Sequence, residues 1–234
     1  MDSGVVVRRS ELPVAWYLVA AIMLIPSGPA TAADSDTQQW TTATIDYAID
    51  RDVVASLTSR IRFEDDISEK KDLLIGPSFA IKAPQNLTVG LGYDHLHAFP
   101  AGSSDENRIW QSLSLEHRAS RPVLSSRLRL DERIIEGIDG VIFRARYRLR
   151  ATYGLVEGPW YLVGFDEVFA NLNSKGEGPV GGFEQNRLFF GLGGQVAARV
   201  KLEMGYQWGY QERRGEDLVT HTILVNFLVF AGGD

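Results

Sequence analysis

Two neighbouring stretches decide the fold of this chain: residues 125–134 read SSRLRLDERI, and residues 141–153 read VIFRARYRLRATY. Basic and apolar residues alternate along both of them. In an extended strand, successive side chains point to opposite faces. The second stretch therefore separates two sets of side chains, with Arg144, Arg146, Arg148 and Arg150 on one face and Phe143, Ala145, Tyr147 and Leu149 on the other. Such a strand has one basic face and one apolar face.

The same alternation recurs along nearly the whole chain. The further segments that show it are residues 40–49, 53–63, 73–82, 87–97, 108–118, 160–171, 186–196, 200–211 and 218–230. A barrel with lipid outside and a polar lumen inside explains an apolar and a polar face on strand after strand. The sequence therefore predicts an all-β fold, a closed antiparallel transmembrane β-barrel.

The number of strands follows less directly from the pattern. The segments amount to about eleven, whereas single-chain bacterial barrels have even numbers of strands. We therefore expect ten to twelve strands and prefer twelve, with one segment divided in two; ten would result if residues 40–49 do not form a full strand. Short turns near residues 83–86, 119–122 and 197–199 alternate with longer loops near residues 64–72, 98–107 and 171–184, which is typical of periplasmic turns and extracellular loops.

The N-terminus has the layout of a secretory signal peptide. Arg8 and Arg9 precede an apolar run over residues 14–25, and a segment of small residues over 26–33 contains Ala30-Thr31-Ala32. The apolar run is shorter than the ~20 residues that a membrane helix needs. We expect residues 1–33 to be a signal peptide and residues 34–234 to be the barrel domain; an uncleaved anchor is the alternative.

Composition limits the chemistry that the chain can perform. It has 234 residues, no Cys and a formal net charge of -6. The missing thiols exclude a disulfide framework and cysteine catalysis, and the mild acidity argues against nucleic acid as a partner. A soluble barrel of the lipocalin type is the structural alternative, but it would leave the arginine faces in water and crowd Tyr206, Trp208 and Tyr210 into one cavity.

The polar faces would line the lumen, and they are rich in arginine. The predicted ligand-binding residues of this lumen are Arg108, Arg118, Arg127, Arg129, Arg133, Arg144, Arg146, Arg148, Arg150, Arg187, Glu116, Glu167 and Glu203. The other side chains expected there are Arg60, Arg62, Lys82, Lys201, Asp46, Asp94 and Asp131. Basic residues thus outnumber acidic ones. Arginine holds carboxylates through two parallel hydrogen bonds, which a lysine cannot do.

This arginine ladder supports two different hypotheses. A narrow passage with fixed positive charge would attract small anionic solutes, such as acidic oligosaccharides or carboxylates, and would act as a channel or a binding barrel. Alternatively, the arginines and carboxylates form salt bridges that fill a small lumen and stabilise it, because small barrels are often packed shut. In that second case the loops would mediate any interaction.

An outer-membrane lipid hydrolase is a third hypothesis, which we consider the weakest. Such an enzyme needs a serine, a histidine and a third polar group. The candidates are His95, His97, His117, His221, Ser103, Ser104 and Ser112, and none lies in a recognised nucleophile motif. The acidic pairs Asp65-Asp66 and Asp105-Glu106 are most simply solvated loop residues. We therefore predict no enzyme activity, no metal site and no cofactor.

The quoted segments resemble a family of Gram-negative outer-membrane proteins of uncharacterised function, the DUF2490 family. The matches are residues 108–111, residues 127–133, Arg144 with Arg146 and Tyr147, Glu167 with residues 169–173, Asn186-Arg187, Gly205-Tyr206 and His221. The resemblance implies a barrel in the outer membrane, in contact with its lipid and inserted by the barrel assembly machinery; it carries no activity. We expect a monomer. The chain departs from the family pattern at Asp131, where Glu is usual, and in the four residues that follow Phe230.

Overall fold

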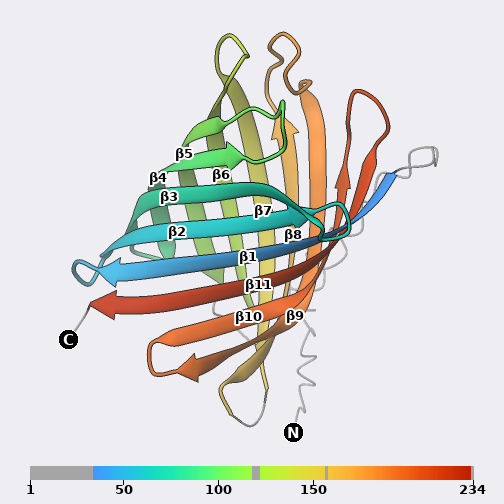
Figure 1. Cartoon of the computed structure of the whole chain (residues 1–234). Coiled ribbons are helices and arrows are strands. Elements are labelled where there is room, and N and C mark those ends of the chain that lie inside the picture. Colours follow the sequence, from blue (N-terminus) through green and yellow to red (C-terminus); the bar gives the residue numbers. More distant parts are fainter. Residues whose placement is uncertain (1–33, 118–121, 156–157, 233–234) are drawn as a thin grey trace, which may run out of the picture. The chain divides into compact units, whose positions relative to one another are not determined.

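The structure is a computed structural model that describes residues 34–117, 122–155 and 158–232. The predicted signal peptide and Arg118 lie outside these residues. The described residues form a closed barrel of eleven strands, shown in Figure 1. The strands are β1 (Asp34–Ala48), β2 (Val53–Glu64), β3 (Glu69–Ala83), β4 (Leu87–Ala98), β5 (Glu106–His117), β6 (Val123–Ile135), β7 (Ile142–Gly154), β8 (Trp160–Asn171), β9 (Gly182–Ala197), β10 (Val200–Gln211) and β11 (Leu218–Gly232).

The barrel closes through a parallel pair of strands. Each strand pairs antiparallel with its neighbour in sequence, and β1 then pairs parallel with β11 over the full register from Asp34–Leu218 to Ala48–Gly232. Eleven lies within the expected range of ten to twelve strands, but the preferred number of twelve was wrong. The prediction that the barrel is antiparallel throughout was also wrong. Each of the eleven alternating segments in the sequence forms one strand. The change from eleven to twelve strands was wrong because it relied on the rule of even strand numbers.

The two ends of the barrel differ in the length of their connections. At one end, which we call the loop end, the strands are connected by residues 65–68, 99–105, 136–141, 172–181 and 212–217. At the other end, which we call the turn end, they are connected by residues 49–52, 84–86, 118–122, 155–159 and 198–199. Because the strand number is odd, β1 begins at the loop end and β11 finishes at the turn end.

Large apolar side chains cover the outside of the barrel, as the alternation predicted. Phe79 on β3, Leu91 on β4 and Phe190 on β9 are 56%, 55% and 63% exposed, whereas their sequence neighbours point inward. The described residues contain no helix that is long and apolar enough to cross a membrane.

Several aromatic side chains face the lumen, which the sequence analysis did not anticipate. Trp40, Val163, Phe189 and Leu224 form a buried apolar cluster on the β1, β8, β9 and β11 side. Glycine makes room for such rings: a Cβ at Gly191 would lie 2.6 Å from Cζ of Phe189 and 2.4 Å from the carbonyl oxygen of Met204. Ring packing over glycine is a known device for stabilising sheets that would otherwise be weak at that position.

Candidate functional site: an arginine-lined lumen

Three carboxylates face the lumen where the sequence predicted loops. Asp72, Glu106 and Glu184 are buried, with 2%, 6% and 9% of their surfaces exposed. The sequence analysis placed them in connections, but β3, β5 and β9 begin earlier than predicted and carry these residues into the lumen. The excess of basic over acidic groups is consequently smaller than the sequence indicated.

Glu106 binds two arginines through pairs of hydrogen bonds. Nε and Nη2 of Arg108 donate to its two oxygens at 2.6 and 2.9 Å, and Nε and Nη2 of Arg133 donate to the same oxygens at 2.6 and 3.1 Å. Arg133 also donates to Glu184 at 3.0 Å, and Arg144 reaches the other oxygen of Glu184 at 3.3 Å. Paired hydrogen bonds of this kind fix the positions of both partners.

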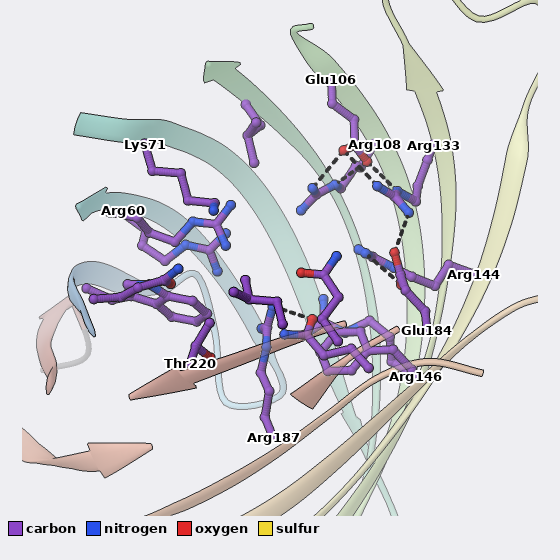
Figure 2. Close-up of a pocket in the computed structure, with 18 of the residues that line it drawn as sticks. Arg60, Lys71, Glu106, Arg108, Arg133, Arg144, Arg146, Glu184, Arg187 and Thr220 are labelled. Atoms are coloured by element: carbon purple, nitrogen blue, oxygen red, sulfur yellow. Dashed lines mark hydrogen bonds and ion pairs between the residues drawn. The ribbon is translucent and has the colours of Figure 1, made fainter. Parts of the chain in front are cut away.

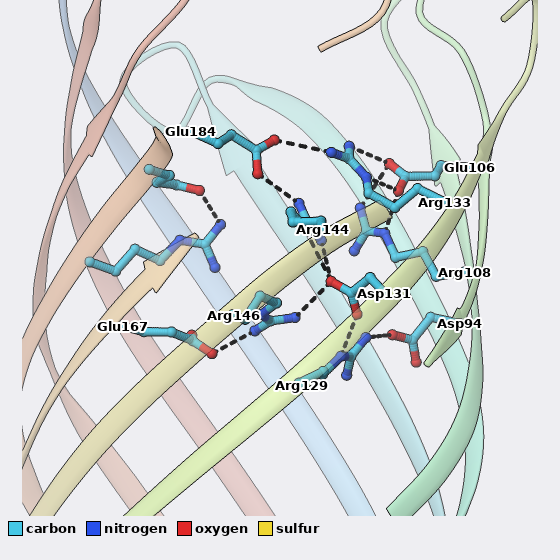
Figure 3. A network of polar contacts seen from close by, with 12 residues as sticks. Asp94, Glu106, Arg108, Arg129, Asp131, Arg133, Arg144, Arg146, Glu167 and Glu184 are labelled. Carbon is cyan, nitrogen blue, oxygen red and sulfur yellow. Dashed lines mark hydrogen bonds and ion pairs between the residues drawn. The ribbon is translucent and has the colours of Figure 1, made fainter. Parts of the chain in front are cut away.

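Asp131 is the centre of a second group of ion pairs, shown in Figure 3. Its side chain is fully buried, and its oxygens accept from Arg129 at 2.5 Å and from Arg144 at 2.8 Å. Arg129 continues to Asp94 at 2.7 Å. We call the set Asp94, Glu106, Arg108, Arg129, Asp131, Arg133, Arg144 and Glu184 the paired network.

The paired network joins strands β4, β5, β6, β7 and β9. It contains four carboxylates and four guanidinium groups, so its formal charge is zero. Burying these groups is tolerable because each one has partners of opposite charge and hydrogen bonds. This part of the lumen thus follows the salt-bridged interpretation of the sequence.

Arginine and aromatic side chains stack across the middle of the lumen. The guanidinium of Arg187 lies 4.7 Å from the ring centre of Trp40 and 4.5 Å from that of Phe169. Arg60 lies 5.6 Å from the ring centre of Trp40, and Arg146 lies 4.6 Å from that of Phe169. These distances are typical of cation–π contacts. The stack runs from β2 through β1, β9 and β8 to β7.

This stack divides the lumen into two cavities. The cavity toward the loop end has a volume of about 240 Å³ and is shown in Figure 2; the cavity toward the turn end has a volume of about 500 Å³. Side chains that line both cavities mark the constriction between them: Trp40, Arg60, Arg108, Arg146 and Arg187.

Three arginines of the lumen differ from those of the paired network. Within the described residues, Arg60, Arg148 and Arg187 form no ion pair; Arg187 donates a hydrogen bond to the Gln185 amide oxygen at 2.9 Å. The buried Nε atoms of Arg60 and Arg187 have no hydrogen-bond partner. Buried donors are nearly always satisfied, so these groups are available to an anion or to water.

The other predicted residues occupy various environments. Arg127 and Arg146 bind Glu167 at 3.1 and 2.8 Å. Arg150 and the hydroxyl of Tyr161 both bind Glu203. Glu116 lies on β5 in phase with the lumen-facing Arg108, while Arg118 falls outside the described residues.

The histidines and acidic pairs give no support to a hydrolytic or metal site. Asp105 and Glu106 separate: Glu106 enters the lumen, whereas Asp105 lies in a loop and contacts His97 at 3.0 Å. A hydrogen bond from the Ala98 amide, together with His97, lowers the pKa of Asp105 below its ordinary value. The described residues contain no group of three or more His, Cys, Asp or Glu that could hold a metal ion.

Comparisons with known proteins agree with the resemblance seen in the sequence. The model of the family described as "Protein of unknown function (DUF2490)" matches residues 37–220. An uncharacterised protein of Methylorubrum extorquens is 27% identical over 221 residues, which cover 91% of this chain and 96% of that protein. Among solved structures, the NanC porin aligns with 79% of this chain and 93% of its own, with a TM-score of 0.49 and 13% identity. Since the family model covers more than half of its residues, the chain belongs to the DUF2490 family.

Proposed function

We propose that the protein is a monomeric β-barrel of the Gram-negative outer membrane whose lumen binds or conducts small anionic solutes. The membrane location is supported by the outer surface, where large apolar side chains are exposed on the outer face of every strand. Soluble monomers rarely expose apolar patches of more than a few hundred Å². The shortest strands have 12 residues, which exceeds the ~9–11 residues that a tilted strand needs to cross a bilayer.

Aromatic residues near the loop end support the same location. Tyr206 bonds to His221 at 2.6 Å, and Tyr210 donates to Asp217 at 2.5 Å, so both keep a polar contact beside their apolar rings. Tyrosine and tryptophan prefer the boundary between lipid and water. Asp166 is a carboxylate on the outer face, and it accepts a hydrogen bond from Asn186 at 2.6 Å. This bond reduces the free-energy cost of placing the carboxylate in an apolar surrounding.

The anion function is carried by one observation: Arg60, Arg148 and Arg187 face the turn-end cavity and have no carboxylate partner in the described residues. No carboxylate of the described residues lies within ion-pair distance of them, whereas every arginine of the paired network has such a partner. In a narrow passage with walls of low dielectric, uncompensated charge concentrates ions of the opposite sign. The anion would gain charge-assisted hydrogen bonds that the free protein lacks.

A closed structural barrel is the second candidate, and the stack across the lumen is the observation that favours it. Trp40 and Phe169 hold Arg60, Arg187 and Arg146 between the two cavities. If this stack does not open, the barrel would bind anions in the turn-end cavity without conducting them. The loops would then be the place where the protein meets other molecules.

Bilayer recordings test this proposal. We expect the refolded barrel to give discrete conductance steps, with a reversal potential in a salt gradient that shows preference for anions. Arg148→Gln should reduce this preference, whereas Arg51→Gln, which removes the same charge from an exposed turn, should leave it nearly unchanged. Cation preference in the wild-type protein, or equal effects of the two substitutions, would contradict an anion site in the lumen.

A silent barrel requires a different measurement, namely binding of radioactive or fluorescent carboxylates to the folded protein. Binding that Arg148→Gln weakens would favour the closed barrel with an internal anion site. Absence of both conductance and binding would contradict both forms of the proposal.

A further inference from the structure

The turn-end cavity has a wall of hydroxyl groups. The side chains that form it are Thr42 and Thr44 on β1, Ser56 and Thr58 on β2, and Ser78 on β3. They follow the inward phase of three adjacent strands, so their hydroxyls lie next to one another on one side of the lumen. The alternation in the sequence shows the polar face of each strand but not that these faces meet.

Arginines occupy the opposite side of the same cavity. Arg127 on β6 and Arg148 and Arg150 on β7 line it. Arg127 pairs with Glu167 and Arg150 with Glu203, and both glutamates line the same cavity, so Arg148 is the member of this wall without an ion-pair partner in the described residues. In the closed order of eleven strands, β7 is five strands away from β2 in one direction and six in the other. The hydroxyl wall and the arginine wall therefore face each other across the diameter of the barrel.

The hydroxyl wall retains hydrogen-bonding capacity. The hydroxyls of Thr44 and Thr58 lie 3.1 Å apart, and Ser56 donates to Asp46 at 2.6 Å. Each hydroxyl provides one proton and two acceptor positions. The bond between Thr44 and Thr58 uses one of their two protons, so the second proton and several lone pairs can serve a ligand.

We infer that the turn-end cavity recognises anions that also carry several hydroxyl groups, that is, sugar acids, rather than simple carboxylates. Arg148 of the arginine wall would hold the carboxylate, and the hydroxyl wall would exchange hydrogen bonds with the hydroxyls of the ligand. The volume of about 500 Å³ is within the range of small-molecule sites, ~300–1,000 Å³. The carboxylate half of this inference rests on the proposed function, and the hydroxyl half is independent of it.

Three probes of similar size separate the two halves. Glucuronate carries a carboxylate and hydroxyls, cyclohexanecarboxylate carries the charge on a ring without hydroxyls, and glucose carries hydroxyls without charge. Calorimetric titration of the folded full-length barrel in detergent should give the highest affinity for glucuronate. We expect an advantage of at least about tenfold over each of the other two probes, since two or three hydrogen bonds of ordinary strength produce such a ratio.

Isosteric variants show which side chains cause a higher affinity for glucuronate. The double variant Thr44→Val with Thr58→Val removes two hydroxyls without changing the shape of the wall. It should lower the affinity for glucuronate to nearly that of cyclohexanecarboxylate and leave cyclohexanecarboxylate binding unchanged. Ser78→Ala provides a milder variant with the same expected direction if the double variant does not fold.

Each other outcome has a defined meaning. Equal affinities for glucuronate and cyclohexanecarboxylate would overturn the role of the hydroxyl wall while leaving the anion site intact. Equal affinities for glucuronate and glucose, or no binding by either acid, would overturn the inference together with the proposed anion function.

Discussion

The paired network and the turn-end cavity are built from the same arginine-rich strands, yet they treat charge in opposite ways. Strand β7 shows the difference within one element: Arg144 binds Asp131 and Glu184, whereas Arg148, two inward positions further along, forms no ion pair in the described structure. Carboxylates from β3, β5 and β9 enter the lumen toward the loop end, while serine and threonine of β1, β2 and β3 line the turn-end cavity together with Asp94, Glu167 and Glu203.

This contrast shows that an arginine ladder does not have a single function. Where carboxylates interleave with the arginines, the ladder joins strands that are distant in sequence and adds to stability and rigidity. Where hydroxyls face the arginines, Arg148 has no ion-pair partner in the described residues, and we propose that its charge is available to a ligand. We therefore propose that the two hypotheses raised by the sequence each describe one part of the lumen.

The largest effect on stability should follow from Asp131→Asn. Asp131 is fully buried and pairs with Arg129, Arg144 and Arg146, so the substitution leaves buried guanidinium groups without their shared carboxylate. Breaking a buried ion pair from one side costs about 3–5 kcal/mol. Urea unfolding in lipid vesicles measures the loss. A loss below ~1 kcal/mol would show that the paired network contributes little to stability.

A smaller loss is expected from Gly92→Ala, which tests how closely aromatic rings pack against the network. A Cβ at Gly92 would lie 2.3 Å from Cζ2 of Trp110, whose ring centre is 4.3 Å from the guanidinium of Arg129. The ring must move, and overpacking of this kind costs about 1–3 kcal/mol. Unfolding experiments should show this loss together with a shift in tryptophan fluorescence. An unchanged spectrum would mean that Trp110 does not lie against Gly92.

Arg148→Gln should leave the free energy of unfolding nearly unchanged or raise it. Because Arg148 has no ion-pair partner in the described residues, its removal leaves no carboxylate without a partner, and it relieves repulsion from neighbouring arginines. Arg144→Gln is the matched comparison on the same strand and should be strongly destabilising, since it leaves Asp131 and Glu184 short of a partner. Equal losses for the two variants would remove the distinction between the two regions.

The smallest effect should come from Asp105 at the loop end, outside both regions. The folded state lowers its pKa through the Ala98 amide and His97. The resulting stabilisation is present above the unfolded pKa of about 4 and is lost as the pH falls through the folded pKa. Asp105→Asn should therefore slightly reduce the melting temperature at pH 7 but not at pH 2. A loss of equal size at both pH values would contradict the electrostatic origin.

Much of the fold could be predicted from the sequence because each strand has two specialised faces. The alternation at Arg144–Arg150 or Leu202–Tyr210 fixes both the strand and the direction of its side chains. The parallel closure follows from the count of eleven segments, because an odd number of strands that each pair antiparallel with the next must close through a parallel pair. The expectation of an even strand number set that count aside.

The sequence predicted the arginines of the lumen and some of their partners, namely Asp94, Asp131, Glu167 and Glu203, but it missed three others. Asp72, Glu106 and Glu184 lie next to charged or glycine-containing segments that resemble loops, so their inward direction became visible only in the structure. The inward direction of two aromatic side chains could have been predicted from the alternation, because Trp40 is in phase with Thr42 and Phe169 is in phase with Glu167. Reading the phase of every aromatic residue would have identified both rings of the stack.

The most direct test of the difference between the two regions is a crystal structure of the protein soaked in bromide, with the ion located by its anomalous scattering. The account predicts bromide in the turn-end cavity and at the constriction, beside Arg60, Arg148 or Arg187, and none within the paired network. Bromide bound to Arg133 or Arg144, or a lumen without bromide at any arginine, would contradict it.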